Sequence, residues 1–270
     1  MTPALTLPAR PTLRLWDAAP ALSAFALLVA LAAIPLLAAA ALDPRSLQGE
    51  GIWVKPLKFH LALTVYFATL AIFARWMPAG MMETRGWRIY QAVIIACTLG
   101  ELLWIGGAAA LGTASHFNLS SPAWAMLYPL MGVFAVTLTS MTLVMGMAIW
   151  RNTATGLPAP VHLSVALGLV LTFVLTVLAA SILAQGTGHL VGTPVTGARL
   201  PLLGWSREVG DLRAPHFLAT HAMHVLPLAG LSALALPSRA QVPAVWIAAA
   251  AFCALVLWAL ATSLAGRPLV

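Results

Sequence analysis

The sequence predicts an all-α protein, a bundle of seven transmembrane helices with a long capping loop on the non-cytoplasmic side. Of its 270 residues, 61% are hydrophobic and only 8% are charged, whereas soluble domains carry about 25% charged residues. The mean hydropathy of +0.94 agrees with this contrast. A chain with so few charges cannot cover its surface with polar groups, so we expect most of that surface to face lipid.

Seven apolar stretches are each close to the roughly 20 residues that a helix needs to cross a bilayer. We expect a single transmembrane domain over residues 20–266, preceded by a flexible, Pro-rich tail over residues 1–19. The first stretch is longer than the roughly 7–15 apolar residues of a signal peptide, so it is expected to be a retained span. The predicted spans cover about 20–42, 56–76, 87–111, 122–150, 160–184, 215–236 and 243–265.

Proline marks the start of six of these spans. A proline at the first helical position costs little, because its missing N–H would have no partner there. Ser121, which precedes one of these prolines, is a favourable N-cap residue. The prolines are Pro20, Pro56, Pro122, Pro160, Pro215 and Pro243.

Arginine and lysine are divided equally between the two sides of the predicted bundle; we call the side of the N-terminus side A and the opposite side B. Side A has Arg10, Arg14, Arg75, Arg85, Arg88, Arg151 and Arg239. Side B has Arg45, Lys55, Lys58, Arg199, Arg207, Arg213 and Arg267. The short loops of side A favour it as the cytoplasmic side, because the positive-inside rule acts chiefly through short loops. With seven spans the N-terminus is then cytoplasmic and the C-terminus periplasmic.

The net charge of +7 does not predict nucleic-acid binding. The basic residues are spread over the ends of spans, which is typical of topology signals and lipid headgroup contacts, and they form no phosphate-binding patch. Cys97 and Cys253 lie in apolar stretches, so no disulfide framework is expected, and no C-x-x-C-H motif for covalent haem attachment is present. The expected partners are the lipid bilayer and a small-molecule ligand.

The longest connection, residues 185–214, lies on side B. Connections of this length are usually functional or disordered, and its apolar content argues against disorder, so we expect it to cover the mouth of the bundle. Lys55 and Lys58 lie on the same side, at the start of the second predicted span. Their ammonium groups are expected to reach the lipid headgroups, with anion binding at the mouth as the alternative.

Six of the seven histidines lie on side B or in the adjoining half of a span: His60, His116, His189, His216, His221 and His224. Glu101 is the only carboxylate inside a predicted span, where it must be protonated, paired or hydrated. A rise of about 1.5 Å per residue places His60 level with His221, and His224 level with Glu101. The sequence therefore predicts a His-rich polar pocket, with Glu101 as a candidate proton relay.

Three chemistries fit this pocket. The first is haem b for redox chemistry, with His60 and His221 as axial ligands and Arg199, Arg207 or Arg213 on the propionates. The second is zinc or copper bound by His221, His224 and a third ligand from His60, His116 or Glu101. The third uses His and Glu without a cofactor, in a proton-coupled transporter or ligand sensor. A structural subunit of a membrane complex, in which the histidines only join helices, is a further alternative, and the sequence predicts no particular reaction.

Two segments carry a resemblance: Gly112-Thr113-Ala114-Ser115-His116-Phe117-Asn118, and the stretch from Asp211-Leu212-Arg213-Ala214-Pro215 to His221. They resemble segments of a family of uncharacterised polytopic integral membrane proteins of bacteria with about seven spans. The resemblance covers about a third of the chain. It implies a bacterial inner membrane and brings no activity, cofactor or site residue with it.

Overall fold

The computed structural model describes residues 15–270. Most of the flexible tail predicted for residues 1–19 therefore lies outside the described residues, while Leu15–Ala18 form a short helix, α1. The remaining α-helices are α2 (Pro20–Leu42), α3 (Val54–Phe73), α4 (Arg85–Ala110), α5 (Pro122–Arg151), α6 (Ala159–Ala184), α7 (Arg213–Thr220), α8 (Ala222–Ala233) and α9 (Ser238–Leu264). A 3₁₀ turn, η1 (Ala74–Trp76), extends α3.

Within the described chain, six helices are long and apolar enough to cross a membrane, which makes the protein an all-α, multi-pass membrane protein. They cover Pro20–Leu42, Val54–Trp76, Arg85–Ala110, Pro122–Arg151, Ala159–Ala184 and Ser238–Leu264. Helices suit this environment because every backbone N–H and C=O inside the segment is satisfied without water.

The predicted helix starts agree with the structure to different degrees. Ser121 is the N-cap of α5 as predicted, and its hydroxyl accepts a hydrogen bond from the N–H of Trp124 at 3.4 Å. By contrast, α9 begins at Ser238, five residues before the predicted Pro243, which lies inside the helix. The signal there is Pro237, which immediately precedes the first helical residue. Proline therefore marks helix starts only approximately in this chain.

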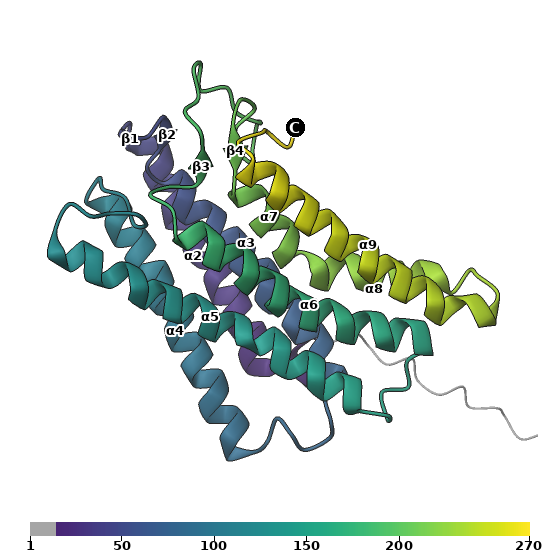
Figure 1. Cartoon of the computed structure of the whole chain (residues 1–270). Helices are drawn as coiled ribbons and strands as arrows, with labels where there is room; N and C mark the ends of the chain where they lie inside the picture. The colour runs from purple at the N-terminus through teal and green to yellow at the C-terminus, as the bar shows by residue number, and fades with distance from the viewer. Residues whose placement is uncertain (1–14) are drawn as a thin grey trace, which may run out of the picture.

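Helix α6 lies at the centre of the bundle, between α5 on one side and α7–α9 on the other (Figure 1). Two apolar cores meet on it. One joins it to α2, α3, α4 and α5 and includes Phe67, Met145 and Leu169. The other joins it to α7, α8 and α9 and includes Leu167 and Phe252.

The predicted span 215–236 is divided into α7 and α8, which meet at His221. The backbone N–H of Met223 does not continue the helix ladder but donates to the hydroxyl of Thr172 on α6 at 2.8 Å. Gly168 permits this close approach, because a Cβ there would lie 3.0 Å from the carbonyl oxygen of Ala222. Pro227, inside α8, has no N–H to donate to the carbonyl oxygen of Met223, so the first turn of α8 is weakened as well. The break therefore depends on both the local sequence and the neighbouring helix.

Helices α7 and α8 together run alongside α9 in the opposite direction (Figure 1). On side B the hydroxyl of Ser263, near the end of α9, donates to the carbonyl oxygen of Asp211, just before α7, at 3.2 Å. At the other end, only residues 234–237 connect α8 to the start of α9. The α7–α8 pair, with 8 and 12 helical residues, therefore lies beside a large part of the 27-residue α9.

Two short antiparallel hairpins lie on side B. The first pairs β1 (Ser46–Leu47) with β2 (Glu50–Gly51) between α2 and α3. The second pairs β3 (Leu190–Val191) with β4 (Gly210–Asp211) and so closes the connection between α6 and α7. Both hairpins stand beyond the ends of the long helices (Figure 1).

Candidate functional site

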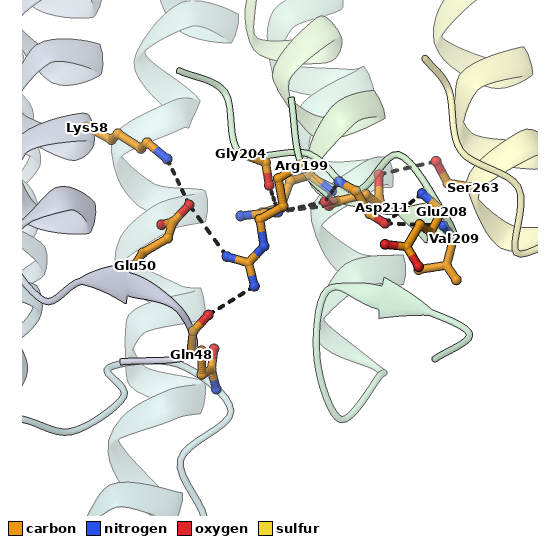
Figure 2. A network of polar contacts seen from close by, with 11 residues as sticks. Gln48, Glu50, Lys58, Arg199, Gly204, Glu208, Val209, Asp211 and Ser263 are labelled. Atoms are coloured by element: carbon orange, nitrogen blue, oxygen red, sulfur yellow. Dashed lines mark hydrogen bonds and ion pairs between the residues drawn. The ribbon is translucent and has the colours of Figure 1, made fainter. Parts of the chain in front are cut away.

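A network of ion pairs joins the two hairpins of side B (Figure 2). The Oε1 atom of Glu50 lies 3.5 Å from the Nζ of Lys58 and 3.7 Å from the Nη1 of Arg199. The Nη2 of Arg199 also donates to the carbonyl oxygen of Gln48 at 2.9 Å. These partly exposed pairs each contribute little energy, but they attach the 185–212 connection to the segment before α3.

A second pair, Arg213 with Asp211, orders the end of this connection. Asp211 is 3% exposed and accepts hydrogen bonds from the Nε of Arg213 at 2.9 Å and from the N–H of Ser206 at 3.0 Å. Burial alone would raise the pKa of Asp211, but the bonds and charge of Arg213, with the N–H of Ser206, hold it below its usual range. Arg213 also donates to the carbonyl oxygen of Gly204. Its guanidinium is thus engaged within the protein.

Glu208 holds the tip of the same connection. Its carboxylate accepts hydrogen bonds from the hydroxyl and N–H of Thr196, from the N–H of Ala198 at 2.6 Å and from the N–H of Val195 at 2.6 Å. These bonds lower the pKa of Glu208 to about 2. The segment from Val195 to Ala198 is therefore held by a single ionised side chain.

The loop between α4 and α5, residues 111–121, carries His116 back toward the bundle. The amide of Asn118 donates to the hydroxyl of Thr113 at 2.9 Å and to the carbonyl oxygen of Ala114 at 2.8 Å. The indole N–H of Trp104, on α4, donates to the carbonyl oxygen of Ser115 at 2.9 Å. Asn118 and Ser115 are buried, whereas Leu111 and Leu119 are exposed, so only the middle of the loop packs into the protein.

His116 contacts Lys55, from the first turn of α3. The Nζ of Lys55 lies 3.2 Å from the Nδ1 of His116, and the hydroxyl of Ser115 lies 3.0 Å from the same nitrogen. Burial, together with the charge of Lys55, lowers the pKa of His116 to about 3. The imidazole is therefore neutral at physiological pH, and its Nδ1 accepts a hydrogen bond from the Lys55 ammonium. Lys55 therefore points into the protein toward His116 and does not reach the lipid headgroups as the sequence predicts.

Glu101 is the buried acid beside this pair. It is 3% exposed, and its Oε1 atom has no hydrogen-bond partner within the described residues. Lys55 is the basic side chain that acts on it electrostatically, although the two do not form a direct ion pair. An ionised carboxylate with an unsatisfied oxygen costs several kcal/mol in so buried a place. The group therefore depends on the charge of Lys55, a proton or a bound partner.

Aromatic rings surround the polar groups. The ring of His116 lies 5.8 Å from that of Tyr128, on α5, and 6.3 Å from that of Phe59, on α3. The Lys55 ammonium lies 6.0 Å from the centre of the Phe59 ring, at the outer limit of a cation–π contact. We call Lys55, Glu101, Ser115, His116 and Tyr128 the Lys55 site.

The predicted pair His221 and His224 lies elsewhere, at the break between α7 and α8. Their ring centres are 5.3 Å apart. The Nε2 of His224 lies 3.0 Å from the hydroxyl of Thr69, which itself donates to the carbonyl oxygen of Val65. His224 therefore donates through Nε2, and its buried Nδ1 has no partner among residues 15–270. The predicted neighbour of His224, Glu101, belongs to the Lys55 site instead.

The other histidines are dispersed. The Nδ1 of His60 lies 2.8 Å from the carbonyl oxygen of Pro56 in its own helix, and no hydrogen bond or ring contact joins it to another histidine of the described chain. His189 lies beside Arg213 in the 185–212 connection; burial and the charge of Arg213 lower its pKa to about 4. His216, in α7, has a buried Nδ1 without a partner in the same part of the chain. A single pocket shared by all these histidines is therefore not observed.

The residues proposed for cofactors are likewise separated. Within residues 15–270, no group of three or more His, Cys, Asp or Glu side chains is placed to hold a metal ion. Of the three arginines predicted to contact haem propionates, Arg199 is bonded to Glu50 and Arg213 to Asp211, while Arg207 is exposed.

The sequence predicts Glu101 and His116 as site residues but not Lys55, Ser115 or Tyr128, and Lys55 is the most important of these three because it supplies the positive charge. The position of Lys55 in the first turn of a span is typical of a lysine that reaches the headgroups, and only the inward fold of residues 111–121 reverses that assignment.

No protein-family model matches the chain, and no curated protein or solved structure matches it.

Proposed function

We propose that the protein is an inner-membrane transporter or ligand sensor in which the Lys55 site binds a small polar molecule together with a proton. The observation that carries this proposal is the Oε1 of Glu101, which has no hydrogen-bond partner among the described residues and is buried beside a lysine with which it forms no direct ion pair. Buried acids in membrane proteins are costly and typically serve ion or proton pathways.

The charges of the site support a ligand that is polar at both ends. His116 is neutral, so Lys55 supplies the positive charge and Glu101 the negative one. A small zwitterion would place its anionic group on Lys55 and its cationic group on Glu101, satisfying both. Protonation of Glu101 would remove one of these interactions, which couples ligand affinity to pH.

We also propose that the chain crosses the membrane seven times, with the α7–α8 pair as the sixth crossing. Its support is the antiparallel course of this pair beside α9 (Figure 1). A discontinuous helix is tolerated at membrane depth where protein groups satisfy the freed backbone, as Thr172 does for Met223. The 185–212 connection is then the cap over the side B mouth.

The distribution of ion pairs supports a cytoplasmic side A and a periplasmic side B. Within residues 15–270, all four ion pairs lie on side B: Arg45 with Asp43, Lys58 and Arg199 with Glu50, and Arg213 with Asp211. The described arginines of side A keep their positive charge without a carboxylate partner, as expected for the cytoplasmic side. Fusing alkaline phosphatase to the C-terminus tests this orientation, because the enzyme is active only in the periplasm.

A zinc or copper ion remains the second proposal, supported by the contact between His221 and His224 and by the Nδ1 of His224, which has no partner among the described residues. Two imidazoles alone supply half of a tetrahedral ligand set. A visible absorption spectrum and elemental analysis of the purified protein test it. A colourless, metal-free preparation that still binds a small polar ligand would refute the cofactor proposal.

The test of the Lys55 site is a thermal-shift screen of small carboxylates, amines and zwitterions at pH 6 and pH 8. We expect one class to raise the unfolding temperature, and Lys55→Met and Glu101→Gln each to abolish that rise. Lys58→Met is the matched control, since Lys58 belongs to the Glu50 network, and it should respond like the unmodified protein. A response that survives both site substitutions would refute the proposal.

A further inference from the structure

An open groove of about 580 Å³ lies on side A, far from the Lys55 site. It runs along the last part of α5 and is bordered by Pro78 and Met81 from the loop between α3 and α4. Above it, the hydroxyls of Tyr90 and Ser140 lie 2.7 Å apart and join α4 to α5. The groove therefore lies between the last turns of α5 and the loop that precedes α4.

The lining of the groove is apolar along α5 and basic at its end. Leu143, Val144 and Met147 supply aliphatic and thioether surface, and Arg151 lies in the last turn of the helix. Arg151 is exposed and forms no ion pair among the described residues. An apolar groove that ends at an unpaired guanidinium matches a molecule with a hydrocarbon chain and an anionic headgroup.

The charge around the groove has the same sign. The described part of side A carries five arginines, Arg75, Arg85, Arg88, Arg151 and Arg239, and two carboxylates, Asp17 and Glu83. Basic pockets between transmembrane helices at the headgroup level bind anionic lipid headgroups. The volume lies within the roughly 300–1,000 Å³ of typical ligand sites.

We propose that this groove is a specific site for an anionic phospholipid, with an acyl chain along Leu143, Val144 and Met147 and the phosphate on Arg151. The site is independent of the ligand proposed for the Lys55 site. Arginine suits the phosphate because its planar guanidinium donates two parallel hydrogen bonds.

The test is native mass spectrometry of the delipidated full-length protein titrated with phosphatidylglycerol or with phosphatidylcholine of the same chains. We expect one phosphatidylglycerol to be retained in preference to phosphatidylcholine. Arg151→Gln should weaken its binding about fivefold, the effect of one basic residue near a membrane surface. Met147→Trp, which fills the groove, should remove the preference.

Arg85→Gln is the matched control, because Arg85 is an exposed arginine of side A that does not line the groove. It should leave phosphatidylglycerol binding unchanged. Equal losses in Arg85→Gln and Arg151→Gln would show diffuse attraction and overturn the proposal, as would equal retention of the two lipids. A folded Met147→Trp protein, verified by size-exclusion chromatography, that binds phosphatidylglycerol normally would also overturn it.

Discussion

The electrostatic coupling between Lys55 and Glu101 can be measured without knowing the ligand. Lys55→Met and Glu101→Gln each remove a charge at nearly constant side-chain volume. Because the two groups form no direct ion pair, their coupling stays below the roughly 4 kcal/mol of two charges about 4 Å apart at an effective dielectric constant of about 20. Burial keeps it above the value for exposed pairs, so we expect about 1–3 kcal/mol.

The assay is a double-mutant cycle in the free energy of unfolding, measured in detergent for both single variants and the double variant. Lys55→Met alone should destabilise the protein, because Glu101 then lies buried without its compensating charge. The double variant should recover part of that loss. Effects of the two substitutions that add to within about 0.5 kcal/mol would refute the coupling. A parallel cycle of Glu101→Gln with Lys58→Met should be additive, because Lys58 interacts with Glu50 instead.

Three further substitutions test the cap and the helix contacts. Glu208→Gln should raise amide exchange of residues 195–198 at neutral pH. The pKa of Glu208 is about 2 in the folded protein against an ordinary 4.5. Its ionised carboxylate therefore stabilises this segment fully above pH 4.5, and the stabilisation is lost as the pH falls through the folded pKa. Thr172→Val should lower the free energy of unfolding by about 1–3 kcal/mol, because the N–H of Met223 loses its acceptor. Gly230→Ala should cost a similar amount, about 1–3 kcal/mol, because its Cβ would overlap Ser164 on α6.

Each of these substitutions has a control. Unchanged exchange at residues 195–198 in Glu208→Gln would contradict the role of Glu208 in holding this segment. Glu83→Gln on side A should leave that exchange as it is. Thr139→Val removes a hydroxyl that bonds only within its own exposed helix turn; if Thr172→Val is equally harmless, the contact at the helix break is unimportant. Adding Ser164→Gly to Gly230→Ala should restore part of the lost stability, because the new Cβ would still lie 2.8 Å from the carbonyl oxygen of Pro160; no recovery at all would contradict the proposed overlap with Ser164.

The membrane character and the positions of the long helices could be predicted from the sequence. Apolar stretches of this length must form helices in lipid, because each residue then satisfies its backbone groups locally. The N-cap at Ser121 and the position of Glu101 within a span are local properties of the same kind, one set by a hydroxyl before a helix and the other by an acid inside an apolar stretch.

Only the tertiary structure decided which polar groups meet. Depth along a helix predicted Glu101 beside His224, but the rotation of the helices and the inward fold of residues 111–121 place His116 and Lys55 in the same site as Glu101. The division of α7 from α8 depends on a hydroxyl of α6, more than forty residues away in the chain. Hydropathy and spacing describe one segment at a time, whereas these contacts arise between segments, so they follow from packing that no single stretch of sequence encodes.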